Sequence, residues 1–277
     1  MAIFRKLKDS EIAVLKSQMC TSSDWDMIEV SDGFSPEYVR YTRFSGRIRL
    51  GAFRKEFELP GGMKKHSGLY HATLHNVTVG DDCCIENVGN YIANYEIGHG
   101  TFIENVDIIL TDGTSTFGNG VEVSVLCETG GREVMIYDGL SAQTAYVMAL
   151  YRHRPELILS LRNMIGSYVA GVSSSTGTIG ADVTIVDSEY IKNVKVGDSC
   201  KIEGASRLKN GSINSNASAP VHVGVGVIGD EEQMMEDFMH VRGSFFEADP
   251  FVTSVREHIT AKSDLGDRAL KLLDGLS

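Results

Sequence analysis

Hydrophobic residues recur at every sixth position between residues 79 and 110. The residues at these positions are Val79, Ile85, Tyr91, Ile97, Ile103 and Ile109. A longer repeat is superimposed, because the sequence IENV at residues 85–88 returns three hexads later at residues 103–106. This period fits neither the 3.6-residue period of an α-helix nor the two-residue alternation of a strand. It is typical of hexapeptide repeats, in which three hexads form one triangular coil of a parallel β-helix.

The side chains at the sixth positions are expected to point into the coil. Each coil then stacks on the next at the ordinary strand spacing of about 4.8 Å. The same period returns at Ile179, Ile185 and Ile191, and Leu208 follows Ile191 at a step one residue short of three hexads. Because one coil cannot bury its own apolar face, the repeats predict a single stacked solenoid built in two blocks.

Two stretches depart from the six-residue period. Between residues 138 and 170 the apolar residues follow helical spacing, and Pro155 suits the first position of a helix. From Asp230 onward, Met, Phe and Leu also recur at helical spacing, and such helices would cap the open end of the solenoid. We therefore expect a mainly β protein, a left-handed parallel β-helix with an inserted helical hairpin and a helical C-terminal cap. The predicted segments are an α+β lead-in (1–60), a first β-helix block (61–137), the helical hairpin (138–170), a second β-helix block (171–229) and the helical C-terminal segment (230–277).

The charge balance excludes some classes of partner. Lys and Arg total 26 against 37 for Asp and Glu, which gives a formal charge of −11. That balance argues against nucleic acid and against an anionic membrane as partners. The first residues lack the apolar core of a signal peptide, and no run approaches the roughly 18 apolar residues that a membrane span requires. We expect a cytoplasmic protein.

The cysteines and the common catalytic motifs narrow the chemistry further. The five cysteines are odd in number and lack CxxC spacing, which argues against a disulfide framework and against a zinc site. Cys83 and Cys200 each fall four residues after a repeat aliphatic residue, and we expect these two to be packing residues. The sequence contains no glycine-rich phosphate loop, HExxH or GxSxG motif. What remains for chemistry is a set of histidines and a set of cationic residues.

The histidines are the candidates for a general base. Group transfer to a hydroxyl or an amine needs a base on the acceptor and a donor for the oxyanion. We expect Asn76 or Asn94 to supply that donor. The alternative is that each histidine is structural or merely exposed, and that the asparagines form hydrogen-bond ladders between coils. The four candidate bases are His66, His71, His75 and His99.

A second set of residues is the candidate for ligand binding. The stretch from Asn90 to Tyr95 is richer in amides and aromatics than packing demands. The planar guanidinium of arginine can donate two parallel hydrogen bonds to a phosphate or carboxylate group. We therefore expect the arginines to bind the anion of a nucleotide-sugar or acyl-carrier ligand. The alternative is that they pair with surface carboxylates. The candidate ligand-binding residues are Asn76, Asn90, Tyr91, Asn94, Arg132, Arg152, His153 and Arg154.

A set of segments along the chain carries a family resemblance. These segments are FELPGG (57–62), KHSG (65–68), HATLHN (71–76), NYIANYEIG (90–98), FGNGVEVSVL (117–126), ETGGRE (128–133), ALYRHRP (149–155) and EGASRLKNGSI (203–213). They resemble an uncharacterised bacterial family, a domain of unknown function with a hexapeptide-transferase-like β-helix. The resemblance covers roughly residues 5–228, and the family brings no established activity. Its members continue the β-helix beyond Asp230, where we expect this chain to become helical.

The resemblance sets the functional expectation. Left-handed hexapeptide β-helices resemble acyltransferases that act on sugars or amino acids, with a histidine base and an acyl-CoA in a groove between subunits. We therefore expect a transferase directed at acyl groups or sugar nucleotides, with acyl-CoA or a nucleotide-sugar as the small-molecule ligand. Triangular β-helices of this type commonly pack around a threefold axis, so we expect a homotrimer. The alternative is a non-catalytic scaffold or a small-ligand-binding protein.

Overall fold

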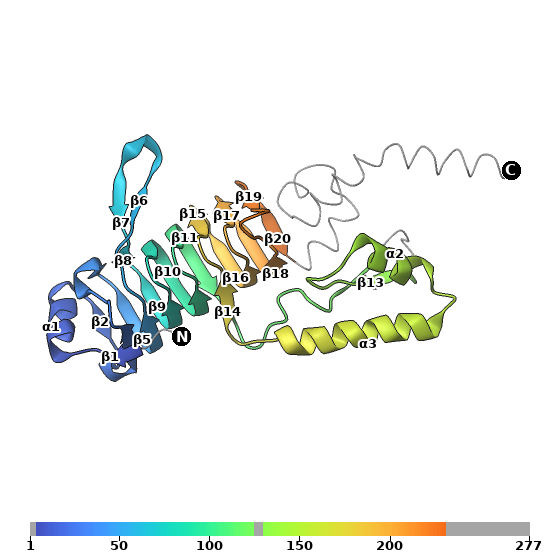
Figure 1. The fold of residues 1–277 in the computed structure, drawn as a ribbon, viewed down its shortest axis with the longest axis horizontal. Helices are drawn as coiled ribbons and strands as arrows, with labels where there is room; N and C mark the ends of the chain where they lie inside the picture. Colours follow the sequence, from blue (N-terminus) through green and yellow to red (C-terminus); the bar gives the residue numbers. More distant parts are fainter. Residues whose placement is uncertain (1–3, 125–129, 231–277) are drawn as a thin grey trace.

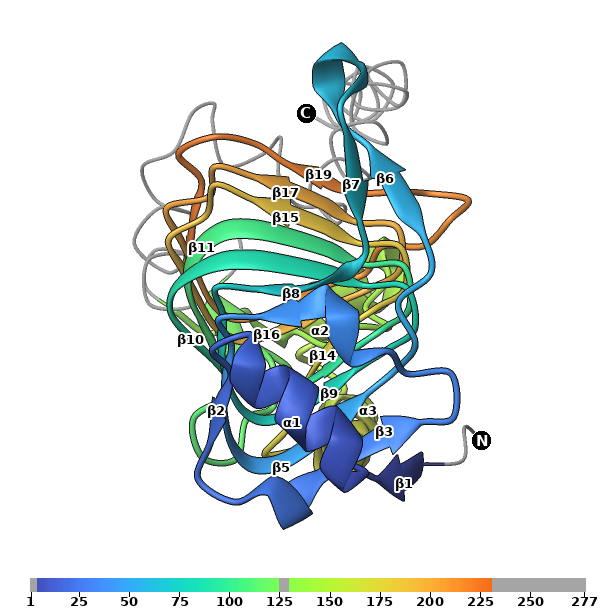
Figure 2. The same cartoon turned by 90° about the vertical axis from the view of Figure 1, so that its left-hand side faces the viewer.

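The protein is an elongated stack of short strands that carries two projections, a β-hairpin and a lobe with two helices (Figure 1). The computed structural model describes residues 4–124 and 130–230. Helix α1 (Asp9–Ser17) lies across the N-terminal end of the stack, where Leu15 is fully buried (Figure 2). The predicted helices between residues 231 and 277 and Cys127 lie outside the described residues.

Parallel pairing dominates the stack. Within the described ranges, sixteen strands form one sheet, and every pairing in it is parallel except that of β1 with β3. These strands are β1 (Phe4–Lys6), β2 (Thr21–Ser22), β3 (Ile28–Ser31), β4 (Val39–Arg40), β5 (Arg43–Leu50), β8 (Gly68–Tyr70), β9 (Thr73–Val79), β10 (Cys84–Ile97), β11 (Phe102–Leu110), β14 (Gly177–Ile179), β15 (Thr184–Val186), β16 (Tyr190–Val196), β17 (Lys201–Glu203), β18 (Arg207–Ile213), β19 (His222–Val223) and β20 (Ile228–Asp230). In the part of the chain that the structure describes, three short 3-10 helices lie between strands: η1 (Trp25–Met27), η2 (Pro36–Tyr38) and η3 (Pro60–Gly62). The prediction of a mainly β protein is confirmed.

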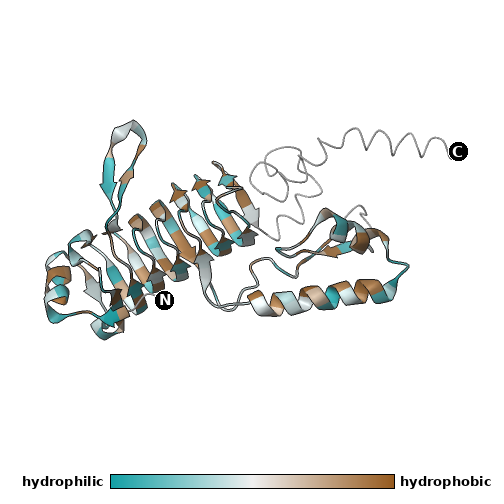
Figure 3. Ribbon diagram, viewed as in Figure 1, coloured by the Kyte–Doolittle hydropathy of each residue, from teal (hydrophilic) through white to brown (hydrophobic). Residues whose placement is uncertain are grey.

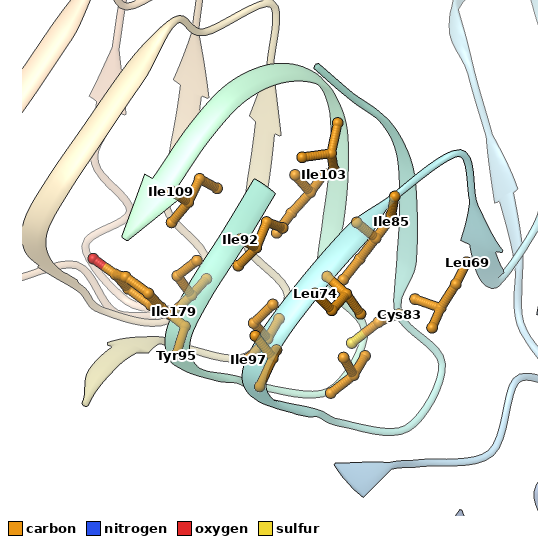
Figure 4. Close-up of a cluster of buried hydrophobic side chains, with 14 of the residues drawn as sticks. Leu69, Leu74, Cys83, Ile85, Ile92, Tyr95, Ile97, Ile103, Ile109 and Ile179 are labelled. Carbon is orange, nitrogen blue, oxygen red and sulfur yellow. The ribbon is translucent and has the colours of Figure 1, made fainter. Parts of the chain in front are cut away.

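The strand register follows the long sequence repeat. Ile85 pairs with Ile103, three hexads later, and Ile191 pairs with Leu208, where the step is one residue shorter. The aliphatic residues of successive turns therefore lie directly above one another in one continuous core (Figure 4). Hydrophobic and hydrophilic residues alternate along the strands (Figure 3). Five of the six predicted inward residues are buried, namely Val79, Ile85, Ile97, Ile103 and Ile109.

The sixth predicted inward residue, Tyr91, is an exception. Its side chain is 36% exposed, whereas the neighbouring Ile92 is fully buried. The cause is a shift of register in β10 between Val88, which pairs with Val106, and Tyr91, which pairs with Ile108. Such a bulge adds one residue to a strand and turns the following side chains to the opposite face. The expectation that Tyr91 points inward is wrong for this reason.

The cysteines are packing residues in the described part of the chain. Cys20, Cys83, Cys84 and Cys200 are free thiols with buried side chains. Burial raises the pKa of Cys83, Cys84 and Cys200 to about 12, so these thiols stay protonated at neutral pH. A protonated, buried thiol is a poor nucleophile.

The chain leaves the stack after Leu110 and rejoins it at Gly177. The intervening lobe contains an antiparallel pair, β12 (Glu122–Ser124) and β13 (Glu133–Met135), and two helices, α2 (Ala142–Leu150) and α3 (Pro155–Val172). Both helices begin in the stretch of helical spacing, and Pro155 occupies the first turn of α3. The lobe has a small core of its own, formed by Val134, Met148, Ala149 and Ile165.

Tyr95 is a buried tyrosine that packs beside Gly177, where the chain rejoins the stack after the lobe. Tyr95 pairs in register with Gly177, where an added Cβ would lie 2.5 Å from the Tyr95 ring. The ring therefore passes Gly177 and reaches Val194, which lies further along the stack. There the Tyr95 hydroxyl donates to the carbonyl oxygen at 2.8 Å and accepts from the amide nitrogen at 3.1 Å. Burial raises the pKa of Tyr95 to about 12, so the hydroxyl keeps its proton.

Replacing Tyr95 by phenylalanine is expected to cost about 1–3 kcal/mol, because the buried N–H and C=O of Val194 lose their partner. Urea unfolding followed by circular dichroism measures this difference. The matched control is Tyr91→Phe, since the Tyr91 side chain is 36% exposed. Equal midpoints for Tyr95→Phe and Tyr91→Phe would contradict the structural role of the Tyr95 hydroxyl.

Candidate functional site

A β-hairpin projects from the stack and forms one wall of the candidate site (Figure 1). Its strands β6 (Glu56–Glu58) and β7 (Lys64–His66) pair antiparallel. At the base, the amide of Ser67 donates to the carbonyl of Lys55 at 2.8 Å, so the chain leaves and re-enters the stack at one point. Gly61 and Gly62 have φ of 84° and 80°, which suits glycine at the tip.

A groove of about 410 Å³ lies beside the base of this hairpin. Strand β7 of the hairpin contributes lining residues, and so do the adjacent strands β4, β8 and β10, which pair with one another in that order. The groove combines basic, acidic and aromatic side chains, and two of the four candidate histidines are among them. Its lining residues are Arg40, Tyr41, Lys64, Lys65, His66, Tyr70, His71 and Glu86.

A hydrogen bond to the backbone defines the tautomer of the neutral His66 ring. Its Nδ1 lies 2.7 Å from the carbonyl oxygen of Ser67. A carbonyl can only accept, so Nδ1 carries the proton and a neutral ring has its lone pair at Nε2. The ring stacks on Tyr38 with 3.8 Å between centroids and 10° between planes. Among the described residues, none forms a hydrogen bond with Nε2 of His66.

His71 lies at a corner of the stack, across Tyr70 from the hairpin. Its backbone has φ of 52°, and its ring stacks on Tyr41 with 4.6 Å between centroids and 7° between planes. Tyr41 has φ of 50° and occupies the same corner one turn earlier. The groove is therefore lined by one histidine from each of two stacked pairs: His66, which stacks on Tyr38 of η2, and His71, which stacks on Tyr41.

The other two candidate histidines lie elsewhere. The Nδ1 of His75 is 2.8 Å from the hydroxyl of Ser45, and its Nε2 is 3.0 Å from the side-chain nitrogen of Asn76. The Nε2 of His99 is 3.9 Å from a carboxylate oxygen of Asp182. Neither residue lines the groove. The structure thus brings His66 and His71 together and separates His75 and His99 from them.

The candidate asparagines make hydrogen bonds along the stack. Asn76 donates to Asn94 at 3.1 Å, and Asn94 donates to the carbonyl of Thr111 at 2.8 Å. Asn90 donates to Asp107 at 2.9 Å. Both Asn76 and Asn94 have positive φ, which asparagine tolerates better than most residues. This is the ladder of the alternative interpretation, and none of these residues, nor Tyr91, lines the groove.

The candidate cationic residues belong to the lobe. Arg152 donates to the backbone carbonyl of Glu133 and lies 3.4 Å from its carboxylate. His153 packs beside Tyr151 with 5.5 Å between ring centroids. Arg132 and Arg154 are exposed, and Arg154 immediately precedes α3. Arg152 therefore makes the carboxylate pairing of the alternative interpretation, and none of these four residues lines the groove.

Sequence reasoning missed most of the groove. Tyr38 and five lining residues, Arg40, Tyr41, Lys64, Tyr70 and Glu86, are not among its candidates, and Lys65 stands out in the sequence only as part of a polar segment. Glu86 carries a usable signal, because it belongs to the IENV sequence that returns at residues 103–106. A charged residue repeated at an outward position marks the face on which a site can form.

The chain matches one protein family over most of its length. The family described as Domain of unknown function (DUF4954) matches residues 4–254. The chain belongs to this family. It is also similar to a Treponema pallidum (strain Nichols) protein described as Uncharacterized protein, with 27% identity over 235 residues. The match covers 81% of this chain and 32% of that protein, so this DUF4954 chain spans about a third of its relative. No solved structure matches it. Among the described residues, no helix has the length and apolar character needed to cross a membrane.

Proposed function

We propose that this chain is an acyltransferase whose active groove lies beside the β6–β7 hairpin, with His66 as the general base. The observation that carries the proposal is the hydrogen bond between Nδ1 of His66 and the Ser67 carbonyl, because it leaves Nε2 free to accept a proton. The donor is an acyl-CoA, and the acceptor is a hydroxyl or an amine. The alternative donor for a transferase at this groove is a nucleotide-sugar.

The proposal includes the finer architecture. We infer that the stack is a left-handed parallel β-helix of hexapeptide repeats. The pairing of residues that lie three hexads apart, or one residue fewer, supports this inference, since three hexads complete one coil. The proposed left-handedness rests on the hexapeptide pattern and on the family resemblance. The proposed assembly is a cytoplasmic homotrimer, which native mass spectrometry of the purified protein tests by its subunit number.

The transfer step follows from the groove chemistry. Nε2 of His66 takes the proton from the acceptor O–H or N–H while the acceptor atom attacks the thioester carbonyl carbon. The C–S bond then breaks, the acyl group remains on the acceptor, and the CoA thiolate takes the proton from His66. Tyr70 is the proposed oxyanion donor, because it lines the same groove as His66 and its phenol supplies an O–H donor.

A coupled assay tests the activity. The purified chain is incubated with acetyl-CoA or longer acyl-CoA and a panel of amino sugars and amino acids, and free thiol is followed with a chromogenic disulfide. Thiol release that depends on both donor and acceptor is the expected result. Nucleotide release from UDP-sugars in the parallel arm would assign the glycosyl donor instead. No product in either arm, with a folded protein, would reject the proposal.

A second candidate function is a non-catalytic scaffold or ligand-binding protein. It is favoured by the observation that several candidate residues make contacts within the chain, as His75 does with Ser45 and Asn76 does with Asn94. Retention of a small molecule in native mass spectra without turnover would support binding alone. Neither retention nor turnover would support a scaffold.

A further inference from the structure

Lys65 forms an ion-pair cluster under the hairpin. Its Nζ lies 2.8 Å from a carboxylate oxygen of Glu86 and 2.6 Å from one of Glu104. These acids occupy paired positions on β10 and β11, and the Lys65 side chain is only 16% exposed. Two carboxylates side by side repel each other, so the ammonium between them stabilises both.

The ammonium group stays charged in this position. Burial acts to lower the pKa of Lys65, but the hydrogen bonds and charges of Glu104 and Glu86 outweigh burial and raise it. The contacts are therefore charge-assisted hydrogen bonds, which are shorter and stronger than neutral ones. They join strand β7 to two different strands of the stack.

An apolar contact reinforces the same attachment. Phe57 pairs with Lys65 across the hairpin, so the two side chains lie on one side of it. The rings of Phe57 and Phe102 have centroids 5.2 Å apart, and Nζ of Lys65 lies 5.7 Å from the Phe102 ring. One side of the hairpin is thus attached to β10 and β11 through an aromatic pair and an ion-pair cluster.

We infer that Lys65 is a positioning residue for His66, and that it fixes the imidazole by attaching β7 to β10 and β11. His66 is the next residue along β7, and successive side chains of a strand point to opposite sides. With Lys65 bound to the stack on one side, His66 faces Tyr38 and keeps Nδ1 on the Ser67 carbonyl. This inference rests on the proposed role of His66 as base.

Lys64 provides a matched control. It lies on the same strand, carries the same charge and lines the same groove. Its side chain is 68% exposed, and its Nζ is 3.4 Å from Glu56 of the same hairpin. Lys64→Met therefore removes a lysine from the hairpin without releasing the hairpin from the stack.

The test is the state of the His66 ring. Long-range proton–nitrogen spectra of protein labelled with ¹⁵N-histidine report which ring nitrogen carries the proton, and His66→Gln assigns the signals. At a pH where the ring is neutral, we expect separate Nδ1–H and bare Nε2 signals in the parent and in Lys64→Met. In Lys65→Met we expect the two signals to move toward each other as both tautomers become populated. Parent-like signals in a folded Lys65→Met protein would overturn the inference.

A second variant covers a failure to fold. Lys65→Met leaves Glu86 and Glu104 unpaired, so the triple variant Lys65→Met, Glu86→Gln, Glu104→Gln removes that repulsion as well. We expect the same averaged His66 signals, and parent-like signals would overturn the inference here too. The spectra do not need turnover. If the Lys65 variants give averaged His66 signals but the parent protein shows no transfer activity, only the proposed function is rejected. If the variants give parent-like signals and the parent protein is active, only the positioning role of Lys65 is rejected.

Discussion

Replacing Ile109 by alanine is expected to lower the free energy of unfolding by about 2–5 kcal/mol. Ile109 is fully buried and lies in register between Ile92 on one turn of the stack and Ile191 on another, both also buried. Truncation removes apolar contacts on both sides and leaves a cavity that neighbouring turns can close only by moving strands. Chemical denaturation of parent and variant measures the loss.

The neighbouring residue is the matched control. Ile108 is the same residue type on the same strand, but it is half-buried and lies on the outer face between Tyr91 and Tyr190. Ile108→Ala is expected to cost about 1 kcal/mol or less. Equal losses for the two variants would contradict the assignment of inner and outer faces, because a shift of one residue exchanges them.

The repetitive part of the fold could be predicted from sequence for a simple reason. Each turn of the stack faces nearly the same surroundings, so the same residue types are selected at the same positions. The pairing of Ile85 with Ile103 and of Val79 with Ile97 follows from this regularity. The outward position of Tyr91 could not be predicted, because Tyr91 and Ile92 can both pack in an apolar core and the sequence does not show which of them follows a bulge.

The groove could not be predicted because it depends on a break in the repeat. Arg40 pairs with Tyr70 and Tyr70 pairs with Glu86, but the first interval along the chain is nearly twice the second. The β6–β7 hairpin accounts for the difference, and His66 is the last residue of its second strand. The predicted boundary at residue 60, between the lead-in and the first β-helix block, falls at the tip of the hairpin. A periodic sequence pattern does not predict on which face of the stack a projecting hairpin lies.

His66→Gln is expected to lower the rate of transfer by about 10²–10⁴-fold, the usual contribution of a general base. Glutamine can still donate its side-chain N–H to the Ser67 carbonyl, so the hairpin base keeps a partner there. It cannot take the proton from the acceptor, and the loss should fall on kcat with a smaller change in KM. Steady-state kinetics in the acyl-transfer assay make the measurement.

His75→Gln is the matched control for this substitution, since His75 is an exposed histidine bonded to Ser45 and Asn76, away from the groove. Its kcat is expected to equal that of the parent. A His66→Gln protein that retains full activity would contradict the assignment of His66 as base, even if the family proves to be catalytic. Loss of activity in His75→Gln but not in His66→Gln would instead assign the site to the region around His75 and Asn76. The comparison discriminates because both substitutions change the same residue type, and only one of them removes a nitrogen lone pair from the groove.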